Sequence, residues 1–325
     1  MSATAGAAQL YDGKGGVKTT GLDDAQIAGR GEDQLLWIDL LAPDDAELED
    51  AAAAVGLEVE TLRQLLDDGT ENGPLDDQGE TIGMHAFALE RSEDGYDRAA
   101  LNAAAGHNWV ITSHGRRLTA VDEFQQRLAT SRRVGALDGG SFIAFLLDWL
   151  FTRYMFEIEK IDDEIDELDL AILRDNSDDS SLETIATLRR RAAAIRRALS
   201  AHREVVSWPA HTDFSDVMTE RAQKHFAATS ERFGQAMASV DSTRDSLDGC
   251  FDLLMSRVAQ RTNDTVRILT VVSVSLLPAT LVTGVLGMNF HPTFFDHPTY
   301  FWIVLAVIVV VVFGVLAVAR LRDWL

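Results

Sequence analysis

The sequence predicts an α+β membrane protein built from an N-terminal α/β domain, long helices of coiled-coil character and a C-terminal hairpin of two transmembrane helices. Three observations predict this fold. Residues 35–135 alternate short apolar strands with helices, the spacing of apolar residues becomes helical from Ser141 onward, and two blocks of 20 uncharged residues stand near the chain end. The predicted domain ranges are 1–135, 136–262 and 263–325.

The N-terminal part shows strands and helices separated by turn residues. β-branched and aromatic runs bounded by Gly, Asp and Asn indicate strands, and Pro43-Asp44 marks a helix start. We predict strands at 35–40, 81–90, 98–105 and 108–112, and helices at 44–54, 61–66 and 118–133.

The middle part is predicted to be helical throughout. From Phe151 to Ile172, apolar residues recur at alternating steps of 3 and 4, which indicates a coiled-coil seam. The rest of this first helix is acidic over residues 157–169, and a basic helix follows until Trp208. We expect the two to lie antiparallel with cross-pairs of charge. The acidic run could instead be a metal-sensing surface. A third helix is predicted to run from Asp213 to Leu286 without a strong breaker before Pro278.

The two apolar blocks, Ile268–Gly287 and Tyr300–Ala319, are each long enough to cross a bilayer core. Asp296 is the only formally charged residue between Ile268 and Ala319. The linker between the blocks is too short for a domain, so the sequence predicts a membrane hairpin.

Flanking arginines predict the orientation of this hairpin. They precede the first block and follow the second, at Arg257, Arg261, Arg267, Arg320 and Arg322, whereas the linker has no Lys or Arg. The positive-inside rule then places the linker outside and both termini in the cytoplasm. Residues 1–20 lack the apolar core of a signal peptide. We expect a multi-pass protein of the inner (cytoplasmic) membrane.

One face of the first transmembrane block carries small and hydroxyl-bearing residues. Steps of 7, 3, 4, 3 and 4 place six residues on this face: Asn263, Thr270, Ser273, Leu277, Thr280 and Gly284. Such a face could line a wet pathway formed by several copies. It could equally serve close helix packing, for which Ser, Thr and Gly are common in membranes.

The triplet Gly287-Met288-Asn289 stands where the first block leaves the membrane, ahead of a short linker, a second span and a short basic tail. With these surroundings it resembles the CorA superfamily of divalent-metal transporters. The resemblance implies a homopentamer, a selectivity loop formed by Gly287, Met288 and Asn289, and a ring of Asn289 side chains at the outer pore mouth. It also implies a set of pore-lining residues: Asn263, Val266, Leu269, Thr270, Ser273, Leu277, Thr280 and Gly284.

The charge and the cysteine content exclude some classes of function and structure. The net charge of −22 lies entirely on residues 1–262, because acids and bases balance from Asn263 onward. This argues against nucleic acid as a partner and is compatible either with gathering cations or with a solubilising surface. The single Cys250 rules out a disulfide framework. The expected partners are further copies of the chain, the lipid bilayer and divalent cations, with no cofactor besides the transported ion.

Residues 11–20 look like a phosphate-binding loop, but Val17 occupies the position that requires Gly, so nucleotide hydrolysis is disfavoured. The alternative is a glycine-rich turn between short strands. The segment Asp12-Gly13-Lys14-Gly15-Gly16 resembles the zinc-transporter (ZntB) branch of the CorA superfamily, whereas Met288 agrees with the magnesium branch.

The predicted function is therefore divalent-cation transport without enzymatic activity, with Zn²⁺ placed ahead of Mg²⁺ (or Co²⁺ and Ni²⁺) and proton coupling left open. Candidate metal-binding residues in the external linker are His291, Asp296 and His297. An ordinary polar linker is the alternative for these three. A membrane-anchored coiled-coil scaffold is the alternative from another functional class.

Overall fold

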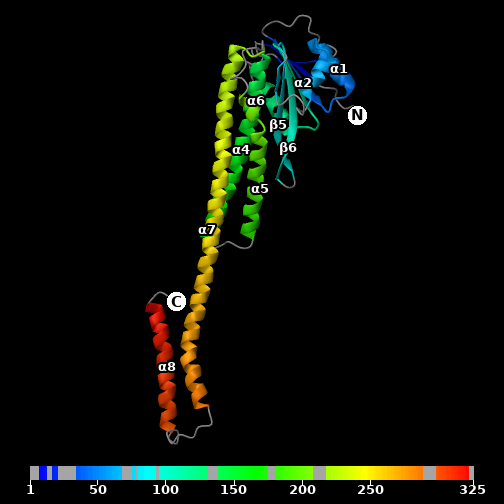
Figure 1. Cartoon of the computed structure of the whole chain (residues 1–325). Coiled ribbons are helices and arrows are strands. Elements are labelled where there is room, and N and C mark those ends of the chain that lie inside the picture. Colours follow the sequence, from blue (N-terminus) through cyan, green and yellow to red (C-terminus); the bar gives the residue numbers. More distant parts are fainter. Residues whose placement is uncertain are drawn as a thin grey trace. The chain divides into compact units, whose positions relative to one another are not determined.

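The computed structural model (Figure 1) describes residues 7–12, 17–20, 34–67, 75–77, 79–92, 95–129, 138–174, 180–207, 217–287 and 298–321. The chain divides into two compact units, Met1–Cys250 and Phe251–Leu325. The predicted three-part division at residues 135 and 262 stays a prediction. An α/β domain, a long helix and a C-terminal apolar helix are present, as the sequence predicts.

A seven-stranded sheet forms the centre of the first unit. Its strand order is β2-β1-β3-β7-β6-β5-β4. Strands β3 and β7 pair in parallel, and the other described neighbours pair antiparallel. The strands are β1 (Ala7–Asp12), β2 (Val17–Thr20), β3 (Gln34–Leu41), β4 (Leu75–Asp77), β5 (Ile82–Ser92), β6 (Gly95–Ala105) and β7 (Trp109–His114).

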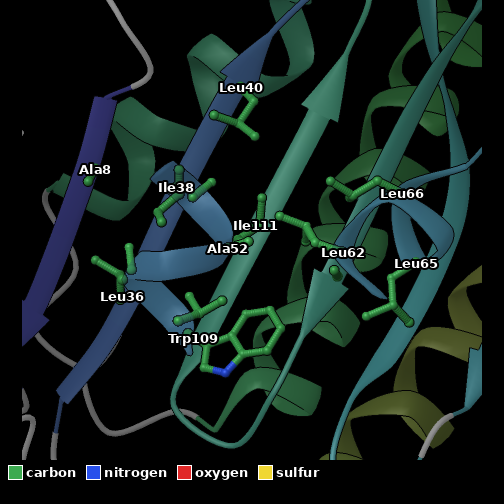
Figure 2. Packing of buried hydrophobic residues seen from close by; sticks show 14 residues of the cluster. Ala8, Leu36, Ile38, Leu40, Ala52, Leu62, Leu65, Leu66, Trp109 and Ile111 are labelled. Atoms are coloured by element: carbon green, nitrogen blue, oxygen red, sulfur yellow. The ribbon is translucent and has the colours of Figure 1, made fainter. Parts of the chain in front are cut away.

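One face of the sheet packs against α1 (Asp45–Val55) and α2 (Val59–Leu66). Alternate β3 residues Leu36, Ile38 and Leu40 point to this side and are fully buried, as Figure 2 shows. Asp44 starts α1 through a capping box with Glu47, in which each side chain accepts from the other residue's backbone N–H. Burying each such Leu or Ile contributes about 1.5–3 kcal/mol.

The opposite face of the sheet packs against α3 (Thr119–Ala129) and the start of α4 (Gly139–Leu173). Trp37 of β3 points to this side, where its ring meets Phe124 at 5.8 Å and Phe142 at 5.5 Å between centroids. The Trp37 indole N–H donates to the Thr112 hydroxyl at 3.0 Å. A buried aromatic cluster therefore joins the sheet to the long helices.

Helix α4 forms an antiparallel hairpin with α5 (Ser180–Ser200), and α7 (Glu220–Leu286) runs beside them in the first unit (Figure 1). The predicted seam from Phe151 to Ile172 is buried along its whole length. The basic helix ends at Ser200 rather than near Trp208, because a turn and the short helix α6 (Arg203–Ser207) follow. Helix α7 begins at Glu220, seven residues later than predicted, where Thr219 caps it by accepting from the Ala222 N–H at 3.1 Å.

The predicted charge pairing of the acidic and basic helices is correct only in part. Arg191 of α5 binds Glu164 of α4 at 2.7 Å. Arg189 and Arg196 form ion pairs with Asp248 and Asp241 of α7, at 2.6 and 2.8 Å. Both of these pairs join residues seven apart in each helix, so they fix the antiparallel register of α5 against α7.

Helix α7 buries an unbroken stripe in the first unit. The stripe follows alternating steps of 4 and 3, and every second member is small or polar: Ala222, Phe226, Thr229, Phe233, Ala236, Val240, Thr243, Leu247 and Cys250. The Phe233 ring lies 5.4 Å from that of Phe151 in α4, and the Thr229 hydroxyl donates to the Ala144 carbonyl at 3.1 Å. Through this stripe α7 packs against α4.

Two side-chain hydrogen bonds link α4 and α7 in parallel at a constant offset of 81 residues. Thr219 donates to Asp138 at 2.6 Å, and the Cys250 thiol bonds to Asp169. Asp138 also caps α4 by accepting from the Ser141 N–H at 2.7 Å. One carboxylate thus ties the starts of both helices together.

A buried histidine closes the open edge of β5. His202 is fully buried, and its Nε2 accepts a hydrogen bond from the Phe87 N–H at 2.9 Å. The Tyr154 hydroxyl donates to the Phe87 carbonyl at 2.8 Å, so both backbone groups are satisfied by side chains. Rings of Phe87, Phe151 and Tyr154 surround the imidazole, and burial lowers the pKa of His202 to about 4.

We predict that this histidine makes the protein sensitive to acid. Because its folded pKa lies below the unfolded value of about 6.5, its contribution is present above pH 6.5 and is lost as the pH falls toward 4. The loss amounts to about 3 kcal/mol over this range. Thermal unfolding of the full chain in detergent, between pH 7 and 4, measures it.

His202→Gln provides the comparison, because an amide oxygen can still accept from Phe87 but does not titrate. This variant is expected to be less stable than the wild type at pH 7 and to lose less stability on acidification. Identical pH slopes for the two proteins would contradict the assignment.

Candidate functional site

The second unit contains the end of α7 and the helix α8 (Pro298–Leu321), which lie side by side (Figure 1, orange and red). By length and composition, both helices are able to cross a membrane. The contact surface of α8 consists of aliphatic residues spaced by one helical turn: Val304, Ile308, Val312, Val315 and Ala319. The predicted apolar hairpin is therefore present as two packed helices.

The side of α7 that packs against α8 is narrow. Val271 and Ser275 are buried there, with 4% and 5% of their surfaces exposed, and Pro278 and Val282 are half-buried. Successive residues of an α-helix turn by about 100°, so these four lie within one stripe. The helix continues through Pro278, whose ring nitrogen has no hydrogen to donate to the Val274 carbonyl.

The predicted pore-lining residues lie on the other side of α7. In the single chain all eight are exposed: Asn263, Val266, Leu269, Thr270, Ser273, Leu277, Thr280 and Gly284. Leu277 has 66% of its surface exposed, against 4% for Val271. Thr270 stands at the edge of this set and also borders an apolar groove of about 440 Å³ between α7 and α8. The hairpin thus leaves the predicted lining uncovered.

The two threonine hydroxyls on this exposed side donate to their own helix. Thr270 donates to the Val266 carbonyl at 2.7 Å, and Thr280 donates to the Leu276 carbonyl at 2.9 Å. Since each hydroxyl has one proton, its oxygen lone pairs remain available on the exposed surface. This side of α7 can therefore accept hydrogen bonds from water.

Of the predicted external site, the structure describes only Gly287. Its N–H donates to the Thr283 carbonyl at 2.9 Å, which ends α7 with a helical turn, and the residue is exposed. Met288, Asn289, His291, Asp296 and His297 lie outside the described residues. Their predicted roles stay predictions.

The acidic run 157–169 forms ion pairs at Glu157 and Glu164, whereas Glu159, Asp163, Asp166 and Glu167 are exposed. Glu157 is buried and accepts from Tyr96 and from Lys160, the latter at 2.8 Å. Burial alone would raise the pKa of Glu157, but these hydrogen bonds and nearby cations lower it. In the part of the chain that the structure describes, no three His, Cys, Asp or Glu side chains gather as a metal site.

The segment resembling a phosphate-binding loop contains two paired strands. Tyr11 of β1 pairs with Val17 of β2, and Lys18 and Thr19 lie within β2. A phosphate-binding loop needs a helix N-terminus behind its Lys-[Ser/Thr] pair. The alternative prediction of short strands flanking the glycines is thus confirmed for 7–12 and 17–20.

The sequence did not identify two residues that position α7. Asp241 and Asp248 hold α7 against α5 through Arg196 and Arg189. The shared spacing of seven residues between the two arginines and between the two aspartates could have indicated this pairing, since residues seven apart lie on one side of a helix.

A family model described as "CorA-like Mg2+ transporter protein" matches residues 32–320. The cobalt/magnesium transport protein CorA of Methanocaldococcus jannaschii is 23% identical over 295 residues, which cover 90% of this chain and 92% of that protein.

Solved structures show the same fold. The complete structure of the CorA magnesium transporter from M. jannaschii covers 100% of both chains with a TM-score of 0.78 at 22% identity. The ZntB cytoplasmic domain from Vibrio parahaemolyticus covers 79% of this chain and 100% of that domain, with a TM-score of 0.55 at 12% identity.

We predict that the exposed side of α7 contacts water and that the outer side of α8 contacts lipid. Ser273→Cys should react with a membrane-impermeant thiosulfonate, because the reactive thiolate forms in water. Two other variants should react at least about tenfold more slowly: Ser275→Cys, which is buried against α8, and Val310→Cys, which lies on the outer side of α8. The protein in liposomes is assayed by intact mass.

The background of this assay should be low. Cys250 is the only native cysteine and is buried, and burial raises the pKa of its thiol to about 12. Equal labelling at 273 and 275 would contradict a water-lined face.

Proposed function

The chain belongs to the family of CorA-like Mg²⁺ transporter proteins, and on this premise we propose that it conducts divalent cations along a path lined by the exposed side of α7. The predicted resemblance to this family is confirmed by the family match over residues 32–320 and by the archaeal relative. Because the family consists of transport proteins, the prediction that the chain is not an enzyme is also confirmed.

One observation carries the proposal. The hydroxyl-bearing side of α7 is exposed in the single chain and lies opposite the stripe that packs against α8. A surface used only for anchoring in lipid would gain nothing from Ser273 and Thr280. A water-filled path requires polar groups at this depth.

A path of this kind requires several copies, since one hairpin cannot enclose a channel. We propose a homopentamer, as the family resemblance implies, with α7 inside and α8 on the lipid side. The apolar outer surface of α8 supports this arrangement, since Val310 and Phe313 have 69% and 67% of their surfaces exposed.

The chemistry of the lining suits an ion that keeps its water shell. Water bound to a cation directs its hydrogens outward, so a wall that accepts hydrogen bonds favours hydrated cations. Thr270 and Thr280 present such acceptors because their protons are used by the helix. Five copies of Asn289 at the outer mouth would add amide carbonyl oxygens of the same kind.

Mg²⁺ is the ion that this lining favours. Mg²⁺ dehydrates reluctantly and prefers oxygen ligands, whereas Zn²⁺ prefers nitrogen and sulfur ligands. The family description and the archaeal relative also name magnesium. Zn²⁺, which the segment 12–16 led us to expect, remains the second candidate; its support is His291 and His297 in the linker.

The driving force can come from the membrane potential. A divalent ion that crosses about 100 mV gains about 4.6 kcal/mol, which supports inward flow without a fuel. We propose that the protein lies in the inner membrane with both termini in the cytoplasm, on the strength of the flanking arginines.

We predict that Thr280→Val lowers Mg²⁺ uptake into proteoliposomes by about tenfold, because several hydrogen bonds of about 0.5–1.5 kcal/mol to the hydrated ion are lost. Thr283→Val is the matched control. Thr283 also donates to its own helix, to the Ala279 carbonyl at 2.9 Å, but lies off the predicted lining. Equal effects of the two variants would argue against this lining.

We further predict that Asn289→Ala abolishes most of the uptake, since the predicted outer ring loses its amide oxygens. Uptake of Mg²⁺ and Zn²⁺ should be measured side by side, each with and without an inward proton gradient. Gradient-independent uptake that favours Mg²⁺ supports the proposal. Gradient-stimulated Zn²⁺ uptake would overturn the ion assignment, and unchanged flux in Asn289→Ala would overturn the pore.

A further inference from the structure

Helix α5 carries two rows of arginines, each spaced by seven residues, with different surroundings. In the first row, Arg189 and Arg196 are bound by Asp248 and Asp241 of α7. In the second row, Arg190 donates to the Thr187 hydroxyl at 3.2 Å, and neither Arg190 nor Arg197 has a carboxylate within ion-pair distance among the described residues. The second row therefore projects exposed cations on another side of α5.

These two arginines border two cavities between α5 and the β5–β6 hairpin. One has a volume of about 490 Å³ and includes Arg91, Arg190 and Arg191 in its wall. The other has a volume of about 300 Å³ and includes Arg98 and Arg197. Tyr96 lines both cavities, so they share a wall at this residue; the two together are called the arginine groove.

Two further cations of the arginine groove, Arg191 and Arg98, are held in place. Arg191 donates to both oxygens of Glu164 at 2.7 Å, and its second terminal nitrogen lies 3.4 Å from the Tyr96 hydroxyl oxygen. The Arg98 guanidinium stacks 4.3 Å from the centre of the Phe87 ring. Such fixed guanidinium groups lose little further entropy when they bind an anion.

Gly95 allows the hairpin to approach α5 this closely. Its φ of 129° lies in a region that L-residues rarely adopt, and a Cβ there would stand 3.1 Å from Cγ of Arg191. The backbone of the hairpin thus lies directly against the arginine stem.

The charge of the arginine groove is opposite to that of the protein. Among the described residues, five arginines line it against two carboxylates, those of Glu164 and Asp97, and Glu157 binds Arg91 at 3.5 Å; the net charge of the chain is −22. The hydroxyls of Ser92 and Thr187 add hydrogen-bond donors, whereas the Tyr96 hydroxyl donates to Glu157. A cationic, hydroxyl-lined depression attracts anions.

We propose that the arginine groove binds a polyphosphate anion, either inorganic or the phosphate chain of a nucleotide. Guanidinium groups match phosphate oxygens in pairs, and the cavity volumes lie within the range of small-molecule sites. Arg190 and Arg197 are two helical turns apart, about 10 Å along the axis. A single phosphate cannot reach both, whereas a chain of phosphates can. Such a ligand would tie the β5–β6 hairpin to α5.

The test is titration calorimetry on the full chain in detergent, with EDTA present to remove divalent ions. Tripolyphosphate should bind at least about tenfold more tightly than orthophosphate, because it contacts more guanidinium groups. ATP is the second probe. Equal affinity for ATP and tripolyphosphate identifies the phosphate chain as the ligand, and tighter ATP binding identifies a nucleotide; both support the proposal.

The matched variants are Arg190→Gln/Arg197→Gln and Arg189→Gln/Arg196→Gln. Both remove two charges from α5, but only the first pair belongs to the arginine groove. The first is expected to weaken tripolyphosphate binding at least about tenfold and the second to leave it within about twofold. Equal weakening by both, retention of affinity in the first, or no binding to the wild type would overturn the proposal. This result is independent of metal uptake.

Discussion

The structure depends on the fixed register between α4 and α7. Asp138 and Asp169, at the start and near the end of α4, bind Thr219 and Cys250, each of which stands 81 positions later in the chain. Within the first unit, neither helix can slide along the other without breaking both contacts. Individually weak hydrogen bonds therefore fix a long element by acting at two places.

The same heptad positions of α7 are buried in both units. The stripe that reaches Cys250 in the first unit recurs in the second at Val271, Ser275, Pro278 and Val282, with the same alternation of steps. The same sequence pattern is thus buried among the helices of the first unit and in the apolar hairpin of the second unit. The residues out of phase with it, such as Ser273 and Thr280, are left uncovered in the single chain.

Patterns that repeat within one element could be predicted from the sequence, and contacts between distant elements could not. The seam of α4, the main strands and the exposed side of α7 follow from spacing alone. The helix ends at Ser200 and Glu220 did not follow, because Thr219 and the turn before α6 act through local capping. Nor did the partners of Arg189 and Arg196, which lie 59 and 45 residues away in sequence. The arginine groove joins Tyr96 to Arg191 across 95 residues and needs the folded sheet to exist.

The two ion pairs between α5 and α7 also limit how these helices can move. The pairs, Arg189–Asp248 and Arg196–Asp241, are one heptad apart. If α7 slid along α5 by a full heptad, about 10 Å, both pairs would break and one new pair would form between the remaining partners. A smaller slide would break both pairs and form none. Small rearrangements in this part of the molecule are therefore expected to be bends of the helices or rotations about the helix axis, and not sliding along that axis.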